Sequence, residues 1–435
     1  MSKDMYMEEE KIFDAQMKLV FSVQRNKRRG HDSLVYENNV VALTVRGMYE
    51  RIEKTLRIRN NYAFLTSLPR WREIMATEFE GRKIDHELCD PLIPYADRFI
   101  LSPYTFNNRK GKGAQAAINQ LIDNICEVSD GYTKPARVIK LDFSGYFPNA
   151  LWNYAEKCIV DVIDKYSADM HFSEEEVGYM KWLAMIAVHC NPAGHCTLRS
   201  PRYLWAEHID KEKSILFKPL GVGAGIGRLV WQMAMGLYIN DIIIWLTEEC
   251  GLKVVCFGDD IVITVREEHH QYALSILPEM RQRLAGRNVH FNEKKFYDQP
   301  YQHGLEFLGS HIKPYRLHLN NSSYSRAIAK IKRMNACRYK DINTMVSSFN
   351  SYSGLLKNRT DYRRLMKMKT ALAEDWWTWL HFDEKRQCLA YNKGFSVNER
   401  LNKKYNLKLK RYERTRSRRN SNGVRSGKLE DNTNR

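Results

Sequence analysis

Two adjacent aspartates, Asp259 and Asp260, lie within one of the most apolar stretches of the chain. The arm before them reads Val-Val-Cys-Phe and the arm after them Ile-Val-Ile-Thr-Val, a composition typical of buried strands. Because Gly258 and Asp259 favour a turn, the segment predicts a β-hairpin with both carboxylates at its tip. A plain turn would account for Asp259, but a second adjacent carboxylate adds like-charge repulsion unless a cation neutralises the pair. The hairpin alone leaves both interpretations open.

A third aspartate lies in the segment "ARVIKLDFSGYFPNA", from Ala136 to Ala150. Residues 138–143 read as a strand that ends near Asp142, followed by a Ser-Gly turn and two aromatic residues. An isolated aspartate at a strand end is unremarkable, but facing the hairpin it would complete a cluster of three carboxylates. Such oxygen ligands suit Mg²⁺. Two ions about 4 Å apart can activate a 3′-hydroxyl and stabilise a leaving pyrophosphate.

The charge of the chain indicates a polyanionic partner. Its 69 basic and 51 acidic residues give a net charge of +18, which favours nucleic acid first and an acidic membrane surface second. The longest apolar run, from Met233 to Leu246, is interrupted by Asn240 and Asp241 and is too short to span a bilayer. We therefore expect no membrane partner.

The N-terminus and the cysteines predict a cytoplasmic location. The first residues are charged and contain no apolar signal core, and the nine cysteines show no tight disulfide framework. The doublets His189-Cys190 and His195-Cys196 have no second pair at zinc-finger spacing, so we interpret them as part of a surface loop.

Composition changes along the chain. A charged helical stretch over residues 1–60 is followed by a mixed basic segment and, from Arg137, by alternating β-rich and helical stretches. Helical sequence returns after about residue 320. From Arg400 onward, 13 basic residues face 3 acidic ones, so this stretch carries +10 of the +18 charge and cannot bury a core. It is either a solvated tail or a nucleic-acid contact.

The glycine-rich run "GVGAGIG", Gly221 to Gly227, matches neither a dinucleotide-binding fingerprint nor a Walker loop. It offers a flexible backbone that another chain can approach closely. Such a surface would suit the space beneath a template base and an incoming nucleotide.

Several motifs occur in the order found in the palm of reverse transcriptases: "LDFSGYF", "GIGRLVWQ", "CFGDD", "NEKKFYDQ" and "EFLGSHI". Upstream, "WREIMATEFEGRKIDHEL" and "SPYTFNNRKGKGAQAAI" resemble fingers motifs of the bacterial enzymes, and "SFNSYSGLLKNRTDYRRL" resembles a thumb. Over residues 60 to 370 the chain resembles the defence-associated (unknown-group) and diversity-generating retroelement reverse transcriptases. The resemblance implies an α+β right-hand polymerase. Its expected segments are a helical extension (1–60), fingers (61–136), an RRM-like antiparallel-sheet palm (137–315) with a fingers-type insertion near 170–215, a helical thumb (316–395) and a basic tail (396–435).

The resemblance also implies roles for single residues. Asp142, Asp259 and Asp260 would bind two Mg²⁺ ions, with Mn²⁺ as an alternative metal. Lys295 would protonate the pyrophosphate, with Lys294 as a competitor. The expected contacts to the deoxynucleoside triphosphate are Arg72, Arg109, Phe147, Gly227 and Gln232, with Arg82 as a helper. The expected primer grip is Phe307, Leu308 and Gly309. Phe147 would be the steric gate against a 2′-hydroxyl, with Tyr146 as the alternative.

Two positions depart from the family pattern. Phe257-Gly258 replaces the usual Tyr-x before the paired aspartates, and Trp231 replaces a small serine. We expected the indole to lie near the template strand and to give an unusual template geometry or a restricted product.

The expected function is therefore an RNA-directed DNA polymerase that copies a cognate non-coding RNA into cDNA in antiphage defence. A retroelement enzyme working with an accessory protein and a catalytically reduced nucleic-acid-binding scaffold are the alternatives, and the intact set of aspartates argues against the scaffold. The expected partners are template RNA, the cDNA product and deoxynucleoside triphosphates. A homo-oligomer or an accessory protein is compatible with the sequence.

Overall fold

The computed structural model describes residues 3–24, 31–67, 70–337 and 341–392. The chain divides into two compact units, Met1–His303 and Gly304–Arg435. This boundary precedes the one predicted between residues 315 and 316, because the strands after Gly304 pair with one another and not with the sheets of the first unit. The predicted basic tail over 396–435 lies outside the described residues.

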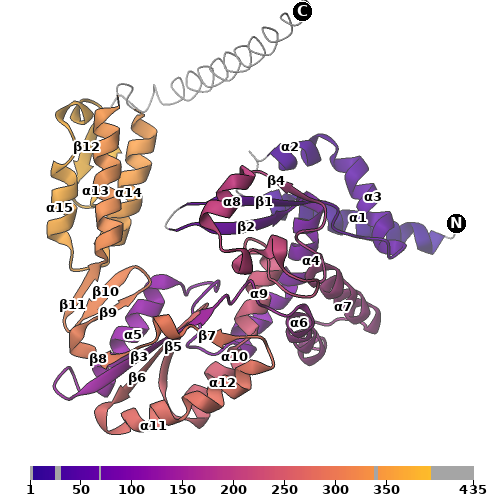
Figure 1. Cartoon of the computed structure of the whole chain (residues 1–435). Helices are drawn as coiled ribbons and strands as arrows, with labels where there is room; N and C mark the ends of the chain where they lie inside the picture. Colours follow the sequence, from indigo (N-terminus) through magenta and orange to yellow (C-terminus); the bar gives the residue numbers. More distant parts are fainter. Residues whose placement is uncertain (1–2, 25–30, 68–69, 338–340, 393–435) are drawn as a thin grey trace, which may run out of the picture. The chain divides into compact units, whose positions relative to one another are not determined.

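The first unit begins with three helices that pack against one another and against a fourth (Figure 1). Their bounds are α1 (Lys3–Gln24), α2 (His31–Asn38), α3 (Val40–Ile52) and α4 (Phe79–Tyr95). Val20 and Val23 of α1, Tyr36 of α2 and Phe79 of α4 form a small buried cluster. Helices thus occupy much of the segment that we expected to be a helical extension.

A three-stranded sheet has the strand order β2-β1-β4. Its strands are β1 (Asn61–Thr66), β2 (Arg72–Thr77) and β4 (Cys196–Leu198). Buried Glu73 of β2 accepts hydrogen bonds from Trp205 Nε1 at 2.8 Å, Ser214 Oγ at 2.6 Å and the Ile215 amide at 2.7 Å. These bonds attach the segment containing α8 (Arg202–His208) to the sheet, so part of the expected insertion near 170–215 packs with the expected fingers.

The central sheet is antiparallel, with strand order β5-β6-β3-β7 and with β8 also paired to β3. Its strands are β3 (Ala136–Ser144), β5 (Lys253–Phe257), β6 (Asp260–Arg266), β7 (His290–Phe291) and β8 (Tyr297–Pro300). The other α-helices of this unit are α5 (Ala114–Val128), α6 (Trp152–Tyr166), α7 (Glu174–Val188), α9 (Leu229–Leu237), α10 (Asn240–Ile244), α11 (His270–Ser275) and α12 (Leu277–Ala285). Helices α5 and α11 pack on β6, whose residues from Ile261 to Val265 are all buried. This burial accounts for the unbroken apolar run after the paired aspartates.

One helical run, Leu229–Glu249, is long and apolar enough to cross a membrane, with a mean hydropathy of 1.4 in its most apolar window. In this fold 78% of that window is buried inside the protein. The core helix of a soluble protein meets the same criterion, so the run is weak evidence for a membrane span.

The second unit contains two small antiparallel sheets and three described α-helices. Its elements are β9 (Leu305–Phe307), β10 (Ser310–Lys313), β11 (Arg316–Leu319), α13 (Asn321–Ala336), α14 (Ile342–Lys357), α15 (Tyr362–Thr370), β12 (Leu380–Asp383) and β13 (Cys388–Tyr391). Ile331, Phe349, Met368 and Trp376 belong to its buried core. The segment expected to be a helical thumb (316–395) contains these three helices together with β11 and the β12–β13 hairpin. The chain as a whole is a mixed α+β fold.

Candidate active site

The three candidate carboxylates lie on neighbouring strands of the central sheet. Phe257 of β5 pairs with Asp260 of β6, so Gly258 and Asp259 form a two-residue turn, as the sequence predicted. Gly258 has a φ of +67°, a conformation that glycine adopts at little steric cost. Across the sheet, Asp260 lies opposite Asp142 of β3. The amide of the next residue in β3 donates to the Asp259 carbonyl at 3.3 Å. The fold therefore brings all three aspartates to one end of the sheet.

Two lysines hold two of these carboxylates. Lys295 Nζ donates to Asp142 Oδ1 at 2.8 Å and to Oδ2 at 2.7 Å, and Asn292 Nδ2 donates to Oδ1 at 3.1 Å. Lys140 Nζ lies 3.2 Å from Asp260 Oδ1. Because Asp142 is only 5% exposed, its charge is both buried and paired.

Asp259 has a different environment. Burial raises the pKa of Asp259, and the negative charges of Asp260 and Asp142 raise it further. A hydrogen bond to its own backbone amide and the positive charge of Arg70 oppose this shift in part. A raised carboxyl pKa means that the ionised form is disfavoured. The turn therefore carries negative charge that the cations of the protein compensate only partly.

The carboxylates of this site suit a divalent cation chemically. In their present arrangement, however, they do not form a complete set of metal ligands. Mg²⁺ prefers carboxylate oxygens, keeps several waters and needs only one or two carboxylates. Within the described part of the chain, however, no three His, Cys, Asp or Glu side chains converge as metal ligands. Lys295 and Lys140 are bound to Asp142 and Asp260, which accounts for this geometry. Coordination by Asp142 would therefore require Lys295 to release it.

Tyr146 and Phe147, the two aromatic residues after strand β3, differ in burial. Tyr146 is 4% exposed, and its hydroxyl donates to the Met235 carbonyl at 2.7 Å, so it is a core residue. Phe147 is half-buried and packs edge-on against Tyr146, with 5.7 Å between ring centroids. Its carbonyl accepts a hydrogen bond from the Ala224 amide at 2.8 Å, beside the glycine-rich loop. The geometry favours Phe147 over Tyr146 as the ring that a ligand can reach.

The glycine-rich loop packs against strand β2. The Ile226 carbonyl accepts a hydrogen bond from the Met75 amide at 3.0 Å. Gly227 has a φ of +120°, and a Cβ there would lie 3.2 Å from Ile74 Cγ2. Close approach to a strand explains this glycine, and its predicted contact with a nascent base pair stays a prediction.

Trp231 does not face a template strand. Its side chain is 0% exposed, and its Cδ1 lies 3.8 Å from the position that a Cβ on Gly225 would occupy. The indole thus fills the core behind the glycine-rich loop. The expectation that it lies near the template strand is wrong. The adjacent Gln232 is half-buried and lines a cavity of about 40 Å³ together with Arg109.

Arg109 is a structural residue in this fold. Its Nε donates to Asp97 Oδ1 at 3.1 Å, and one terminal nitrogen donates to the carbonyls of Ser102 at 2.7 Å and Thr105 at 3.0 Å. The other terminal nitrogen donates to the Asp97 carbonyl. Since the side chain is only 7% exposed and most of its N–H donors are used within the loop, a contact of Arg109 with a triphosphate would require these bonds to break, and that contact stays a prediction.

The other candidate arginines differ in their surroundings. Arg72 is exposed at the start of β2, where a triphosphate could reach it. Arg82 forms an ion pair with Asp32 of α2 at 2.8 Å, which ties α2 to α4. Arg70 is exposed and close enough to Asp259 to affect its pKa. The sequence analysis missed Arg70, because only its position in space relates it to the carboxylates.

Two further groups were also missed. Lys140 lies two residues before Asp142 and therefore on the same face of β3, a relation that strand alternation could have indicated. Buried Arg228 forms an ion pair with buried Asp85, with Nε 3.2 Å from Oδ2, and fixes the end of the glycine-rich loop to α4. No sequence motif relates those two residues, which are far apart in the chain.

The predicted primer-grip residues form a tight turn in the second unit. Phe307 pairs with Ser310, and Leu308 and Gly309 between them have φ values of +46° and +75°. Their predicted role at a primer terminus stays a prediction.

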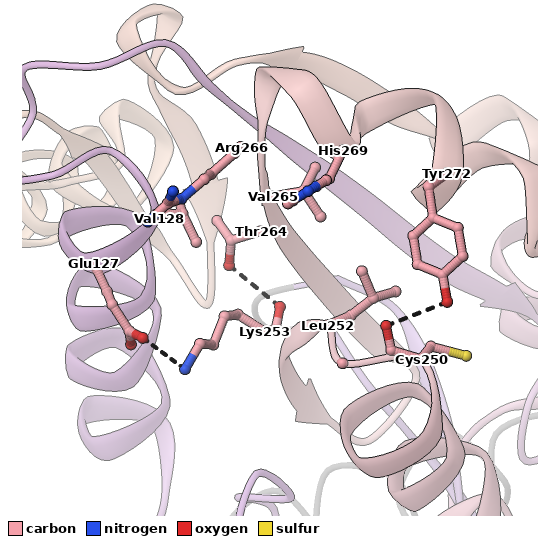
Figure 2. A pocket seen from close by; sticks show the side chains of 11 residues that line it. Glu127, Val128, Cys250, Leu252, Lys253, Thr264, Val265, Arg266, His269 and Tyr272 are labelled. Atoms are coloured by element: carbon pink, nitrogen blue, oxygen red, sulfur yellow. Dashed lines mark hydrogen bonds and ion pairs between the residues drawn. The ribbon is translucent and has the colours of Figure 1, made fainter.

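A larger cavity, of about 490 Å³, lies at the opposite end of the β5–β6 hairpin from the aspartates (Figure 2). Lys253 and Glu127 in its lining pair with each other at 2.8 Å, and Tyr272 donates a hydrogen bond to the Cys250 carbonyl at 3.3 Å. The charged and polar groups of this cavity thus bond to other residues that line it. We therefore place the candidate chemistry at the aspartates.

No family model matches the sequence, and no curated protein matches it. Among solved structures, the chain resembles a telomerase from Candida albicans in complex with a TWJ fragment of telomeric RNA, at 9% identity and a TM-score of 0.42, over 75% of this chain and 57% of that one. It also resembles an apo telomerase from Candida tropicalis, at 9% identity and a TM-score of 0.44, over 68% of this chain and 52% of that one. The chain thus spans little more than half the length of these telomerases. The likeness concerns the fold alone.

Proposed function

We propose that the chain is a metal-dependent nucleotidyltransferase that extends a DNA strand along an RNA template. The main support is the position of Asp142 opposite Asp260, with Asp259 in the adjoining turn. The raised pKa of Asp259, which burial and its two acidic neighbours cause, indicates a site whose charge a cation would complete. The order of the sequence motifs and the net charge of +18 support nucleic acid as the substrate.

In this proposal the oxygen of a primer 3′-hydroxyl attacks the α-phosphorus of a nucleoside triphosphate. The new P–O bond forms as the bond to the pyrophosphate breaks, and the hydroxyl loses its proton. Two bound Mg²⁺ ions would supply charge compensation for this step. Lys295, once released from Asp142, is placed to donate a proton to the leaving pyrophosphate. Phe147 would exclude a 2′-hydroxyl by its volume, which selects deoxynucleotides, and Arg70 and Arg72 would attract the triphosphate.

Primer extension tests the proposal. Wild-type protein should extend a DNA primer on an RNA template with Mg²⁺ or Mn²⁺, and Asp142→Ala or Asp260→Ala should abolish extension while leaving RNA binding intact. Asp298→Asn is a matched control, since this carboxylate lies in the same sheet but pairs with Arg137 at 3.0 Å. If Asp260→Ala melts at a lower temperature than this control, its loss of extension reflects folding and not chemistry.

A second candidate, a catalytically reduced nucleic-acid-binding scaffold, is supported by one observation. The ion pair between Lys295 and Asp142 occupies a carboxylate that the proposal assigns to a metal ion. If wild-type protein binds RNA but never extends a primer with either metal, the scaffold replaces the polymerase.

The biological setting is also a proposal. We favour antiphage defence with a cognate non-coding RNA over a retroelement that uses an accessory protein. A structured non-coding RNA gene alone beside the coding sequence would support defence. A neighbouring gene with variable repeats would support the retroelement.

A further inference from the structure

Helix α3 buries several polar side chains against the protein. Its buried residues are Thr44, Gly47, Met48, Glu50 and Arg51. Arg51 forms ion pairs with Glu80 of α4 at 2.9 Å and with Glu87 of α4 at 2.6 Å. Apolar contacts also contribute, because Tyr36 of α2 belongs to a buried cluster against which Val40 and Leu43 pack. An ordinary surface helix buries a mostly apolar face, whereas the inward side of α3 is largely polar.

The outward side of α3 is correspondingly apolar. Val41 is 60% exposed, Tyr49 42% and Ile52 45%, while Val45 between them is half-buried. The spacings of four, four and three residues place these side chains along one face of the helix.

Exposed apolar residues also occur on the neighbouring helix α2. Only Asn39 separates the two helices, and its carbonyl accepts a hydrogen bond from the Leu43 amide at 3.0 Å. On α2, Leu34 is 46% and Val35 47% exposed. We call the set the α2–α3 stripe: Leu34, Val35, Val41, Val45, Tyr49 and Ile52. A single exposed apolar residue needs no explanation, but a group of them on neighbouring helices marks an interaction surface.

We propose that the α2–α3 stripe is the contact surface for a second copy of this chain. Charge favours this occupant. Residues 31–52 contain three acidic residues, Asp32, Glu37 and Glu50, and two basic ones, Arg46 and Arg51, so their formal charge is −1 in a chain of +18. The segment therefore has no net positive charge that would attract nucleic acid. Two basic chains can approach through this segment with the least repulsion.

The spacing also suits self-association. Side chains three and four residues apart are those by which packed helices interlock. Helix α3 has 13 residues, which at about 1.5 Å per residue is roughly 20 Å of contact length. A two-fold axis near the middle of α3 would place Val41 of one copy against Ile52 of the other, so one surface complements itself. Because the stripe is small beside the roughly 800 Å² per partner of a standard interface, we expect a dimer with a Kd on the order of micromolar.

Sedimentation or light scattering tests the proposal on full-length, nuclease-treated protein in high salt, where RNA cannot bridge two copies. Wild-type protein should be a dimer at the highest concentrations and dissociate on dilution. The variant Val41→Glu/Tyr49→Glu, at two exposed positions, should associate at least tenfold more weakly. Arg46→Glu is the matched control, since this side chain lies on the same helix, is half exposed and pairs with Glu50, outside the stripe; it should dimerise like wild type.

Folding is checked independently by the melting temperature at dilutions where all variants are monomers. The exposed stripe positions should leave this temperature unchanged. A wild-type protein that stays monomeric over the whole range, or a stripe variant that dimerises like wild type, would overturn the proposal.

Discussion

Replacing Asp259 with asparagine removes a charge with almost no change in side-chain size. Burial, Asp260 and Asp142 raise the pKa of Asp259, so the folded state favours its protonated form. A raised folded-state pKa gives a stabilising contribution that is present below the unfolded pKa and is lost as the pH rises through the folded pKa. At neutral pH the ionised side chain therefore costs stability. Asp259→Asn should remove that cost.

The size of the effect follows from the packing of the carboxylates. Asp259 lies in the turn beside Asp260 and is affected by the charges of Asp260 and Asp142, and two unit charges about 5 Å apart repel by about 3 kcal/mol at an effective dielectric constant of ~20. Lys295 and Lys140 offset part of the repulsion through contacts at 2.7 and 3.2 Å. We expect Asp259→Asn to raise the free energy of unfolding of the metal-free protein by about 1–2 kcal/mol, or the melting temperature by roughly 2–6 °C.

Thermal unfolding in EDTA and in Mg²⁺ measures this effect. Mg²⁺ should raise the melting temperature of wild-type protein and hardly change that of Asp259→Asn. The difference between the two proteins in EDTA should shrink as the pH falls and wild-type Asp259 becomes protonated. Primer extension by the variant should fall about a thousandfold or more, since a lost metal ligand costs several kcal/mol in the transition state.

Asp298→Asn serves as the control, because Asp298 accepts from Arg137 at 3.0 Å and lies 2.7 Å from His270, so its neutralisation should destabilise the protein. A lower melting temperature of Asp259→Asn in EDTA would refute the reasoning. So would a response to Mg²⁺ equal to that of wild type.

Three further predictions concern other residues. Phe147→Val should raise the incorporation of ribonucleotides relative to deoxyribonucleotides, whereas Tyr146→Phe should lower stability by about 1 kcal/mol through loss of its hydrogen bond and leave selectivity unchanged; nucleotide competition and thermal unfolding distinguish the two. Arg109→Lys should lower the melting temperature without raising KM for the nucleotide, because its donors close a loop; a raised KM at unchanged stability would support the triphosphate role. Arg51→Met should cost about 3–5 kcal/mol of unfolding free energy in chemical denaturation, because it removes the buried guanidinium that pairs with both Glu80 and Glu87.

The sequence alone determined local features that depend on few neighbours. The β-branched arms around Gly258 and Asp259 predicted the hairpin, because a two-residue turn fixes which residues pair. The strand that contains Asp142 was also predicted from local signals. Its composition suits a buried strand, and a Ser-Gly turn follows it. These local signals were sufficient to identify the three aspartates.

Only the tertiary structure decided how the long side chains are used. An arginine offers the same donors whether it meets a triphosphate or its own loop, and the contacts of Arg109 with Asp97 depend on how the chain folds back on itself. The burial of Trp231 likewise depends on α4, which packs against α9 and precedes it by more than a hundred residues. The sequence indicates only that residues 1–60 are helical and charged, whereas the inward position of Arg51 on α3 depends on Glu80 and Glu87 of α4, which pair with it. Sequence periodicity reports which residues share a face, but which face is covered depends on partners that are distant in sequence.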